Sequence, residues 1–374
     1  EISCSLVGSE MCIRDRRHTT ENRKNTGAMT QFQTFSTALA AAMGTGNILG
    51  VAAALLIGGP GAIFWMWISA LLGMMLTYTE NVLGQHYARE IGTQRIAGPM
   101  AYLRFGLNSP ALAAIYALLC VLASFGMGNM TQSSAIAALA DRAFSLPPLA
   151  VGIAVTLLLG VILLRGVKTV GKVIQWLMPM LSGVYMLAAL AVILRHGTML
   201  PQVFSTIFRE AWGLGAIGGG ISGAAFRMAL QTGLRHGVFS NEAGLGTSAL
   251  VHAGGSSRDA ELQGHWSMIE VALDTLVCCT LTALAILTSG AISASDTSEG
   301  VIIAAFSGIF QGCTEQIMAV MTGLFAFCTL IGWCCCGERA ASYLLGEQAL
   351  KYYRVIYCLA AGMGAVLSLH AVWA

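Results

Sequence analysis

Four small or polar residues, Gly44-Thr45-Gly46-Asn47, lie in the middle of an apolar stretch, 32–79, that contains no charged side chain. Such a stretch is typical of a membrane span, and glycine destabilises a helix interior by about 0.5–1 kcal/mol relative to alanine. A break in a span frees backbone N–H and C=O groups, which lipid tolerates only where they line a cavity. The N–H groups suit a substrate carboxylate, and the carbonyls suit Na⁺. The tetrapeptide therefore predicts a binding site.

A second interruption, at 239–246, has the sequence FSNEAGLG, which places a hydroxyl, an amide, a carboxylate and two glycines between apolar flanks. Two broken spans in one chain point to a transporter site near the middle of the bilayer. Glu242 in this break is expected to act either as a backbone latch or as a group that binds and releases a proton.

Carboxylates also occur inside other apolar stretches, where an ionisable group is costly and functional by default. Glu80 is expected to cap backbone groups of a neighbouring broken helix rather than to touch substrate. Asp274 and Thr275 are adjacent in a later stretch, and the sequence alone gives them no role.

Two pairs of polar or aromatic residues are spaced to share a helix face. Asn129 and Gln132 are three residues apart, and Thr329 and Trp333 are four apart. An interhelical hydrogen bond explains Asn129 or Gln132 as well as a substrate contact does. Trp333 suits either a binding site or the membrane interface.

The composition is that of a polytopic membrane protein. Hydrophobic residues make up 56% of the chain and charged residues only 10%, with a mean hydropathy of +0.71, whereas soluble domains carry about 25% charged residues. The net charge of +2 provides no basic face for nucleic acid. The eleven cysteines have no disulfide or metal-binding spacing, so no metal centre or cofactor is expected.

Hydropathy predicts an all-α protein with about nine spans and a short helix near 299–310. The spans are 33–58, 62–85, 110–140, 147–164, a fifth ending near 194, 221–253, 264–289, 315–337 and 353–373. Basic residues concentrate in the loops after every second span, which predicts a cytoplasmic start for the first span. These residues are Arg89, Arg95, Arg104, Arg165, Lys168, Lys172, Arg258, Arg339, Lys351 and Arg354.

The two ends of the chain are expected to be cut. Residues 1–16 include LVGSEMCIRD, which resembles a translated sequencing adapter, and are expected to be non-native. Residues 17–32 are then a cytoplasmic lead-in. Residues 33–374 form a single transmembrane transporter domain that is incomplete at its C-terminus, and the chain as a whole is expected to be a fragment.

Several segments resemble the sodium:alanine (alanine or glycine:cation) symporter family. They include ALAAAMGTGNILGVAAALLIGGPGAIFWMW, AGPMAYL, GVFSNEAGLGTSALVHA, QGHWSMIEVALDTLVCC and FAFCTLIGW, in this order along the chain. The resemblance implies an inverted-repeat fold like that of the neurotransmitter:sodium symporters. Cys328 departs from the family pattern, which usually has a small hydroxyl residue there.

The resemblance also implies roles for individual residues. The substrate pocket would be made by Thr45, Gly46, Gln132, Phe239, Asn241, Thr329 and Trp333, with amides of Thr45 and Gly46 holding the carboxylate. A Na⁺ site would use the carbonyls of Ala40, Met43 and Ala326 and the hydroxyl of Thr329. A second cation site at Asn47 and Ser240 follows only by analogy with the broader fold.

The predicted function is secondary active symport of Na⁺ with alanine or glycine across the plasma (inner) membrane, by alternating access. Coupling to H⁺ through Glu242 or Glu80 is the first alternative, and a non-transporting amino-acid sensor of the same fold is another. An intramembrane enzyme is disfavoured because no H-E-x-x-H or G-x-S-x-G sequence occurs. The predicted partners are therefore a small amino acid, Na⁺ or H⁺, and the lipid bilayer.

Overall fold

The computed structural model describes residues 29–91, 94–213 and 219–367, which are almost entirely helical. The predictions for residues 1–16, and for 17–28 of the lead-in, lie outside these ranges. The elements up to residue 195 are α2 (Gln31–Ala42), η1 (Thr45–Asn47), α3 (Leu49–Gly58), α4 (Gly61–His86), β1 (Arg89–Ile91), β2 (Gln94–Ile96), α5 (Pro99–Ala101), η2 (Tyr102–Gly106), α6 (Pro110–Phe125), η3 (Gly126–Met130), α7 (Thr131–Phe144), α8 (Pro148–Leu163) and α9 (Val167–Arg195). The later elements are η4 (Gly197–Met199), α10 (Leu200–Ala211), α11 (Gly219–Asn241), α12 (Thr247–His252), α13 (Ala260–Val271), η5 (Ala272–Cys279), α14 (Thr280–Ser289), η6 (Ala291–Ser293), α15 (Ser298–Phe310), α16 (Thr314–Leu345), η7 (Glu347–Ala349) and α17 (Leu350–Val366).

The first predicted span is divided into two helices. α2 begins with a capping box, in which the Thr30 hydroxyl accepts the Gln33 N–H at 3.2 Å and the Gln33 side chain accepts the Thr30 N–H at 3.0 Å. α2 ends at Ala42 because Met43 adopts an extended conformation, and the short turn η1 then leads into α3. The break lies at the position that the glycines predict.

The sixth predicted span is also divided, between the end of α11 at Asn241 and the start of α12 at Thr247. Three residues of this connection have a positive φ: Glu242 at 55°, Gly244 at 92° and Gly246 at 75°. Glycine adopts this region readily, whereas a residue with a side chain seldom does. The two glycines thus permit the turn, and Glu242 is held in an unusual conformation within it.

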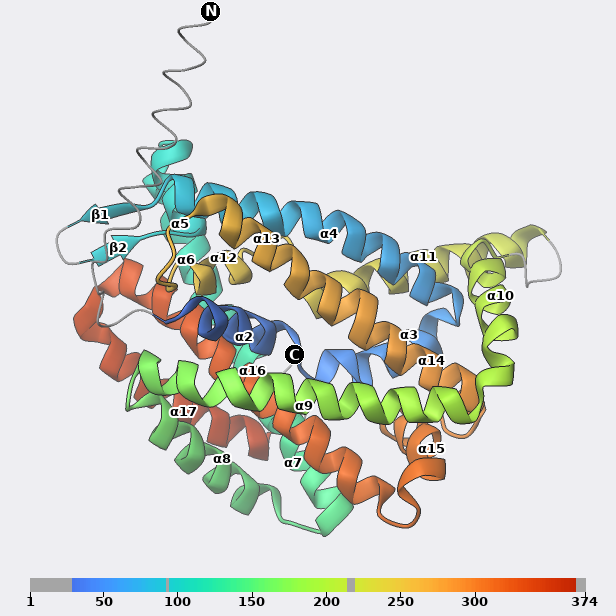
Figure 1. The fold of residues 1–374 in the computed structure, drawn as a ribbon. Helices are drawn as coiled ribbons and strands as arrows, with labels where there is room; N and C mark the ends of the chain where they lie inside the picture. Colours follow the sequence, from blue (N-terminus) through green and yellow to red (C-terminus); the bar gives the residue numbers. More distant parts are fainter. Residues whose placement is uncertain (1–28, 92–93, 214–218, 368–374) are drawn as a thin grey trace, which may run out of the picture.

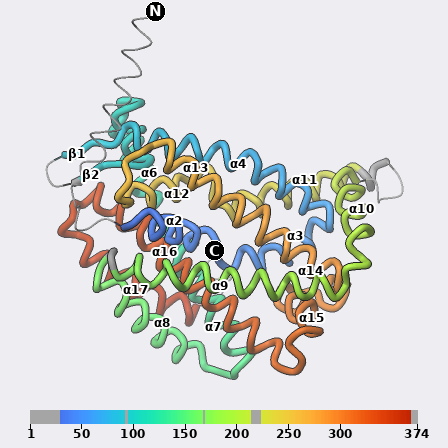
Figure 2. The backbone as a smooth tube through the Cα atoms, viewed as in Figure 1, coloured from blue at the N-terminus to red at the C-terminus, as the bar shows by residue number. Residues whose placement is uncertain are grey.

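The two broken segments run in opposite directions beside each other (Figure 1; Figure 2). α2 contacts α12, and α3 contacts α11, so the two breaks meet near the centre of the molecule. This antiparallel course is what an inverted repeat requires, but the repeat itself and the likeness to neurotransmitter:sodium symporters remain predictions.

Two groups of helices surround the breaks. α4 lies against α11 and α13, and together with the broken segments these helices form one group, which continues through η5 into α14. α16 lies against α6 and α7, and α17 against α8, to form the other group. α16 also contacts α2 directly, so the two groups meet at the first break.

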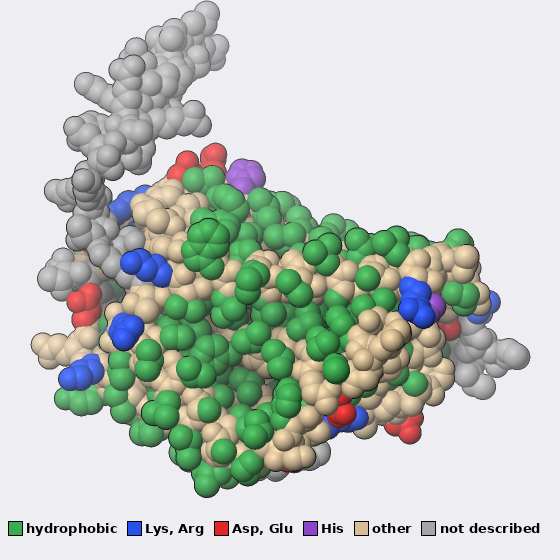
Figure 3. Space-filling view, turned by 60° about the horizontal axis from the view of Figure 1, so that its bottom comes forward, with side chains coloured by type: hydrophobic (Ala, Val, Ile, Leu, Met, Phe, Trp, Pro, Cys, Tyr) green, Lys and Arg blue, Asp and Glu red, His purple; other side chains and the backbone are tan. Residues whose placement is uncertain are grey.

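The helices have the length and surface expected for a membrane protein. In the described ranges, five helical segments are long and apolar enough to cross a membrane: 61–86, 110–144, 169–195, 260–289 and 314–345. Hydrophobic side chains cover most of the face shown in Figure 3, and charged ones lie toward its edges. Among the described residues, helices occupy each of the nine predicted spans, although residues 368–373 of the ninth lie outside the described ranges and the number of helices that cross the bilayer remains a prediction.

The structure corrects three details of the sequence interpretation. α9 begins at Val167, so Lys172 lies in a helix rather than in a basic loop. A two-stranded antiparallel hairpin, β1–β2, occupies the region predicted as a polar loop. α10 was not predicted, because its buried residues Val203, Ile207 and Ala211 recur every four positions without forming a span-length apolar run.

Candidate functional site

A small pocket lies where the two breaks meet α7 and α16. Its volume is about 20 Å³. Its walls are formed by Ala41, Ala42, Gly44, Gly46, Met127, Gln132, Phe239, Glu242, Thr329 and Trp333. Five of the seven residues predicted to bind substrate therefore line one space: Gly46, Gln132, Phe239, Thr329 and Trp333.

The other two predicted substrate residues lie next to this pocket. The Thr45 hydroxyl donates to Gln132 Oε1 at 3.2 Å and faces a larger cavity. Asn241 is not among the lining residues, because its amide nitrogen donates to Thr275 Oγ1 at 3.3 Å and its amide oxygen accepts the Ala243 N–H at 3.1 Å. Asn241 thus holds the second break, and a direct substrate contact for it remains a prediction.

Trp333 forms part of the wall of the small pocket. A cavity of this volume holds about one water molecule, so an amino acid has to displace side chains to occupy it. The Trp333 ring lies directly against Gly128 of η3, where any Cβ would collide with the ring. Gly128 therefore allows the indole to reach the wall of the small pocket.

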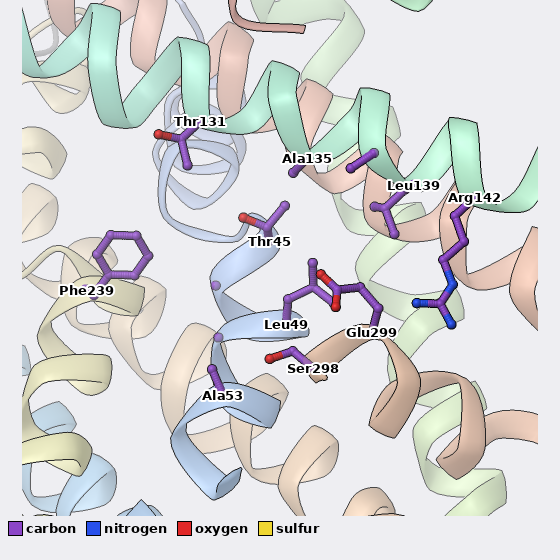
Figure 4. A pocket seen from close by; sticks show the side chains of 13 residues that line it. Thr45, Leu49, Ala53, Thr131, Ala135, Leu139, Arg142, Phe239, Ser298 and Glu299 are labelled. Carbon is purple, nitrogen blue, oxygen red and sulfur yellow. The ribbon is translucent and has the colours of Figure 1, made fainter. Parts of the chain in front are cut away.

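A larger cavity of about 530 Å³ adjoins the small pocket and shares Gly46 and Phe239 with it. Figure 4 shows Thr45 and Phe239 at one end of this cavity and Arg142 and Glu299 at the other. Near its outer end Arg142 Nε pairs with Glu315 Oε1 at 2.8 Å, and both side chains are partly exposed. The cavity gives a path to the breaks from this side of the protein.

The opposite side of the small pocket is closed by hydrogen bonds to the second break. Trp333 Nε1 donates to Glu242 Oε1 at 2.8 Å, and the Tyr116 hydroxyl donates to the Leu245 carbonyl at 2.8 Å. Further out, Arg95 donates to Gln85 Oε1 at 2.7 Å. Burial, with Arg258 and Arg339 nearby, lowers the pKa of Arg95 to about 10, so it stays protonated at neutral pH. Among the described residues, the large cavity therefore lies on one side of the small pocket and these hydrogen bonds lie on the other.

The residues of the predicted Na⁺ site meet at the contact between α2 and α16. The Thr329 hydroxyl lies 3.3 Å from the Met43 carbonyl oxygen. The Gly44 N–H, which would bond to the Ala40 carbonyl in a continuous helix, donates instead to Asn47 Oδ1 at 3.1 Å. Ala40 and Ala326 are fully buried. The break therefore leaves the Met43 carbonyl beside the Thr329 hydroxyl, which also donates to the Phe325 carbonyl at 3.2 Å, while a cation site here remains a prediction.

The residues of the predicted second cation site converge on Asp274. Asn47 Nδ2 donates to Asp274 Oδ1 at 2.6 Å, and the Ser240 hydroxyl donates to Oδ2 at 2.7 Å. The Thr275 hydroxyl donates to Oδ2 at 2.8 Å. We call these four residues the Asp274 cluster. Asp274 is fully buried, and none of the ion pairs found in the described part of the chain involves it.

Asp274 is the site residue to which sequence reasoning assigned no role. A lone carboxylate in the apolar run 271–287 is the same signal that singled out Glu80. Glu80 itself accepts hydrogen bonds from the backbone of Gly244 and Gly246. The Asn129 amide nitrogen donates to the Tyr357 carbonyl at 2.8 Å, and this bond joins η3 to α17. Asn129 is not among the residues that line the small pocket.

A second buried network holds α12 in place. His252 Nε2 lies 2.5 Å from Glu270 Oε1, and its other ring nitrogen contacts Gln263 Oε1. The Ser248 hydroxyl donates to Glu270 Oε2 at 2.8 Å. Gln263 also donates to Gln31 Oε1 at 2.8 Å. These bonds join α12, α13 and α2, so the two breaks belong to one connected group of helices.

Comparison with known proteins gives consistent results. The chain matches the sodium:alanine symporter family over residues 5–374. It is 38% identical to an uncharacterized transporter of Haemophilus influenzae over 93% of this chain and 77% of the relative. It is 35% identical to the sodium/alanine symporter AgcS of Methanococcus maripaludis, over 94% and 79%. It is also 35% identical to the probable sodium/glutamine symporter GlnT of Bacillus subtilis, over 94% and 73%.

The fold is also found among solved structures. The Eremococcus coleocola manganese transporter superimposes with a TM-score of 0.62, covering 88% of this chain and 68% of that one. The sequences are only 16% identical, so this likeness shows the fold alone. The chain therefore shares the helix arrangement of that protein.

Proposed function

Because the chain belongs to the sodium:alanine symporter family, we propose that it couples inward movement of Na⁺ to uptake of alanine or glycine. The observation that carries the proposal is the small pocket between two helix breaks, beside the Thr329–Met43 contact. A relative, AgcS, of which this chain matches 79%, is named a sodium/alanine symporter. Another, GlnT, is named for glutamine, so the preference for a small side chain rests on this chain's own pocket.

The substrate's carboxylate would bind at the first break. The N–H groups of Thr45 and Gly46, in the turn that precedes α3, would bind it, because the helix dipole favours negative charge there. Gln132 faces the same space from α7. Trp333 and Phe239 close the pocket around the side chain, so each added methylene must collide with a ring or move it. This arrangement supports selection of alanine or glycine over longer amino acids.

Na⁺ would bind where α2 ends. Carbonyls of a broken helix coordinate Na⁺ in transporters of this kind. Here the carbonyls of Ala40, Met43 and Ala326 and the Thr329 hydroxyl would supply the oxygen atoms. The bound ion would fix the break and so order the amides that bind substrate. Binding of either ligand should then tighten binding of the other by the same factor.

A second Na⁺ would bind at the Asp274 cluster. Its oxygen ligands would come from the Asp274 carboxylate and the Ser240 and Thr275 hydroxyls, while Asn47 positions the carboxylate through its amide nitrogen. A carboxylate buried without a positive partner is costly, and a bound cation offsets that cost. This adds an anionic ligand to the cation site predicted at Asn47 and Ser240.

Transport would then require the two groups of helices to move relative to each other. In the described conformation the large cavity leads to the site from one side. The hydrogen bonds from Trp333 to Glu242 and from Tyr116 to Leu245 join the two groups on the other side. These bonds must break for substrate to leave, which makes them the expected inner gate.

The test of the proposal is uptake of radiolabelled alanine by the full chain in liposomes. An inward Na⁺ gradient is expected to accumulate alanine several-fold, and collapsing the gradient with an ionophore should release it. Glutamine at equal concentration should compete poorly. Uptake that is independent of Na⁺ and follows an imposed pH gradient would instead favour H⁺ coupling. This alternative is tested because one relative, YrbD of Bacillus subtilis, is named a putative sodium/proton-dependent alanine carrier protein. Alanine binding without flux would instead indicate a sensor.

A single substitution tests the first cation site. Thr329→Val removes the hydroxyl but keeps the shape of the side chain. If the hydroxyl contributes about 1.5 kcal/mol to the binding free energy of Na⁺, its loss should raise the Na⁺ concentration for half-maximal uptake about tenfold. Thr322→Val, a buried change on the same helix, serves as the matched control and should leave that concentration unchanged. Equal Na⁺ dependence in the two variants would rule out Thr329 as a ligand.

A further inference from the structure

The Glu242 carboxylate forms part of the wall of the small pocket. The residue is only 6% exposed, and no ion pair of the described residues includes it. Sequence reasoning left it as a latch or a proton carrier. Its geometry indicates a third role, in substrate binding.

The two oxygens of this carboxylate differ in their hydrogen-bond partners. Oε1 accepts the Trp333 indole N–H at 2.8 Å, which fixes the direction of the group. Oε2 is buried and has no hydrogen-bond partner of good geometry among the described residues, although the Thr247 side chain lies beside the carboxyl group. A buried carboxylate oxygen without a donor is unfavourable, so the position is suited to a donor that arrives with a ligand.

The backbone maintains this position at a cost. Glu242 has φ of 55°, a region in which side-chain-bearing residues are uncommon. Glycine would take this conformation more easily, as Gly244 and Gly246 do in the same turn. A strained residue beside a pocket, with one carboxylate oxygen left buried and unpartnered among the described residues, is the pattern expected of a functional group.

The rest of the pocket complements one end of an amino acid but not the other. The first break offers N–H groups, which suit the carboxylate. The ammonium group needs acceptors, and among the residues that line this pocket Glu242 is the one with an acidic side chain. Glu242 Oε2 supplies both the acceptor and the opposite charge within the same small space.

We propose that Glu242 binds the ammonium group of the substrate through Oε2, while Trp333 holds Oε1. This inference rests on the proposed function, that is, on the small pocket accepting an amino acid. The substrate's positive end would then neutralise a buried carboxylate at the contact between the second break and α16. Hydroxy acids and N-acylated amino acids, which lack the charge, would be excluded.

The experiment compares alanine with lactate, in which a hydroxyl replaces the ammonium group. Equilibrium binding of each is measured in Na⁺ on the full chain in detergent. The wild type should bind alanine at least about 100-fold more tightly than lactate, as expected for loss of a buried charge pair. Glu242→Gln should weaken alanine about 100-fold and leave lactate nearly unchanged, so that the two affinities become similar.

Glu80→Gln is the matched control, because Glu80 is also a buried glutamate but bonds to backbone outside the pocket. It should keep the preference for alanine over lactate, even if both bind more weakly. A Glu242→Gln protein that loses alanine and lactate binding in equal proportion would show a purely structural role and overturn the proposal. Unchanged alanine affinity in that variant would overturn it as well.

A second variant keeps the test decisive if Glu242→Gln does not fold. Glu242→Asp retains the charge but withdraws it by one methylene, so alanine should bind about tenfold more weakly and still better than lactate. An aspartate variant with wild-type alanine affinity would contradict the proposal. If the wild type binds neither ligand, the proposed function itself fails, and that result is distinct from each of the others.

Discussion

Replacing Asp274 with asparagine is expected to abolish Na⁺-driven alanine uptake. The substitution keeps the size of the side chain but removes the negative charge on which Asn47, Ser240 and Thr275 converge. Truncating one partner of a buried charge pair costs about 2–5 kcal/mol, which is about 30-fold or more in cation affinity. The measurement is the initial uptake rate as a function of Na⁺ concentration, with protein amount in the liposomes held equal.

The loss should be specific to ion coupling. Alanine exchange at saturating Na⁺ should fall less than net uptake from low Na⁺, because the substrate pocket is made by other residues. Asp141→Asn, at an exposed aspartate of α7, is the control and should transport normally. An Asp274→Asn protein with wild-type Na⁺ dependence would show that the cluster only holds the helices together, and would leave the Thr329 site as the one supported by the geometry.

The break positions could be predicted from sequence because the signal is local. Glycines and polar side chains within an apolar run are enough to disfavour a continuous helix, and α2 and α11 end where these residues occur. The helix α15 was likewise predicted at 299–310 and runs from Ser298 to Phe310. α10 escaped prediction because a helix with one buried face has no run of apolar residues long enough to register as a span.

The grouping of the site residues required the fold. Asn47 is 227 positions from Asp274, and only the antiparallel arrangement of the broken segments brings them together. Sequence spacing placed Gln132 and Trp333 each on a helix face, but it could not show that these two faces border the same pocket. The resemblance to a family named the pocket residues in advance, and the structure groups five of the seven around one space.

The sequence could not predict that Glu242 Oε1 accepts a hydrogen bond from Trp333 while Oε2 has no partner of good geometry among the described residues. The difference depends on the position of the Trp333 indole. That position is possible only because Gly128, more than two hundred positions away in the chain, has no side chain. A sequence reveals that a carboxylate lies in a break. It does not reveal which oxygen is left for a ligand, because that is decided by packing between distant segments.

Gly44→Ala is expected to impair Na⁺ binding, because the added methyl group meets the hydroxyl of Thr329, a proposed ligand of the ion. The new Cβ would lie 2.5 Å from Thr329 Oγ1, closer than atoms of this kind approach. The φ of Gly44 is −129°, which alanine also adopts, so backbone strain does not explain the effect. Either Thr329 must turn away from the Met43 carbonyl, or the break must move from α16. Overpacking of this kind costs about 1–3 kcal/mol.

The Na⁺ concentration for half-maximal alanine uptake should therefore rise about tenfold or more in Gly44→Ala, while membrane insertion and folding stay normal. Gly183→Ala adds the same methyl group to α9, where no atom lies within 4 Å, and should behave as the wild type. Combining Gly44→Ala with Thr329→Ser tests the cause, because serine keeps the hydroxyl and removes the methyl group that restricts its rotation. Recovery of Na⁺ affinity in the double variant is expected. A Gly44→Ala protein with normal Na⁺ affinity would contradict a cation site at Thr329 and Met43.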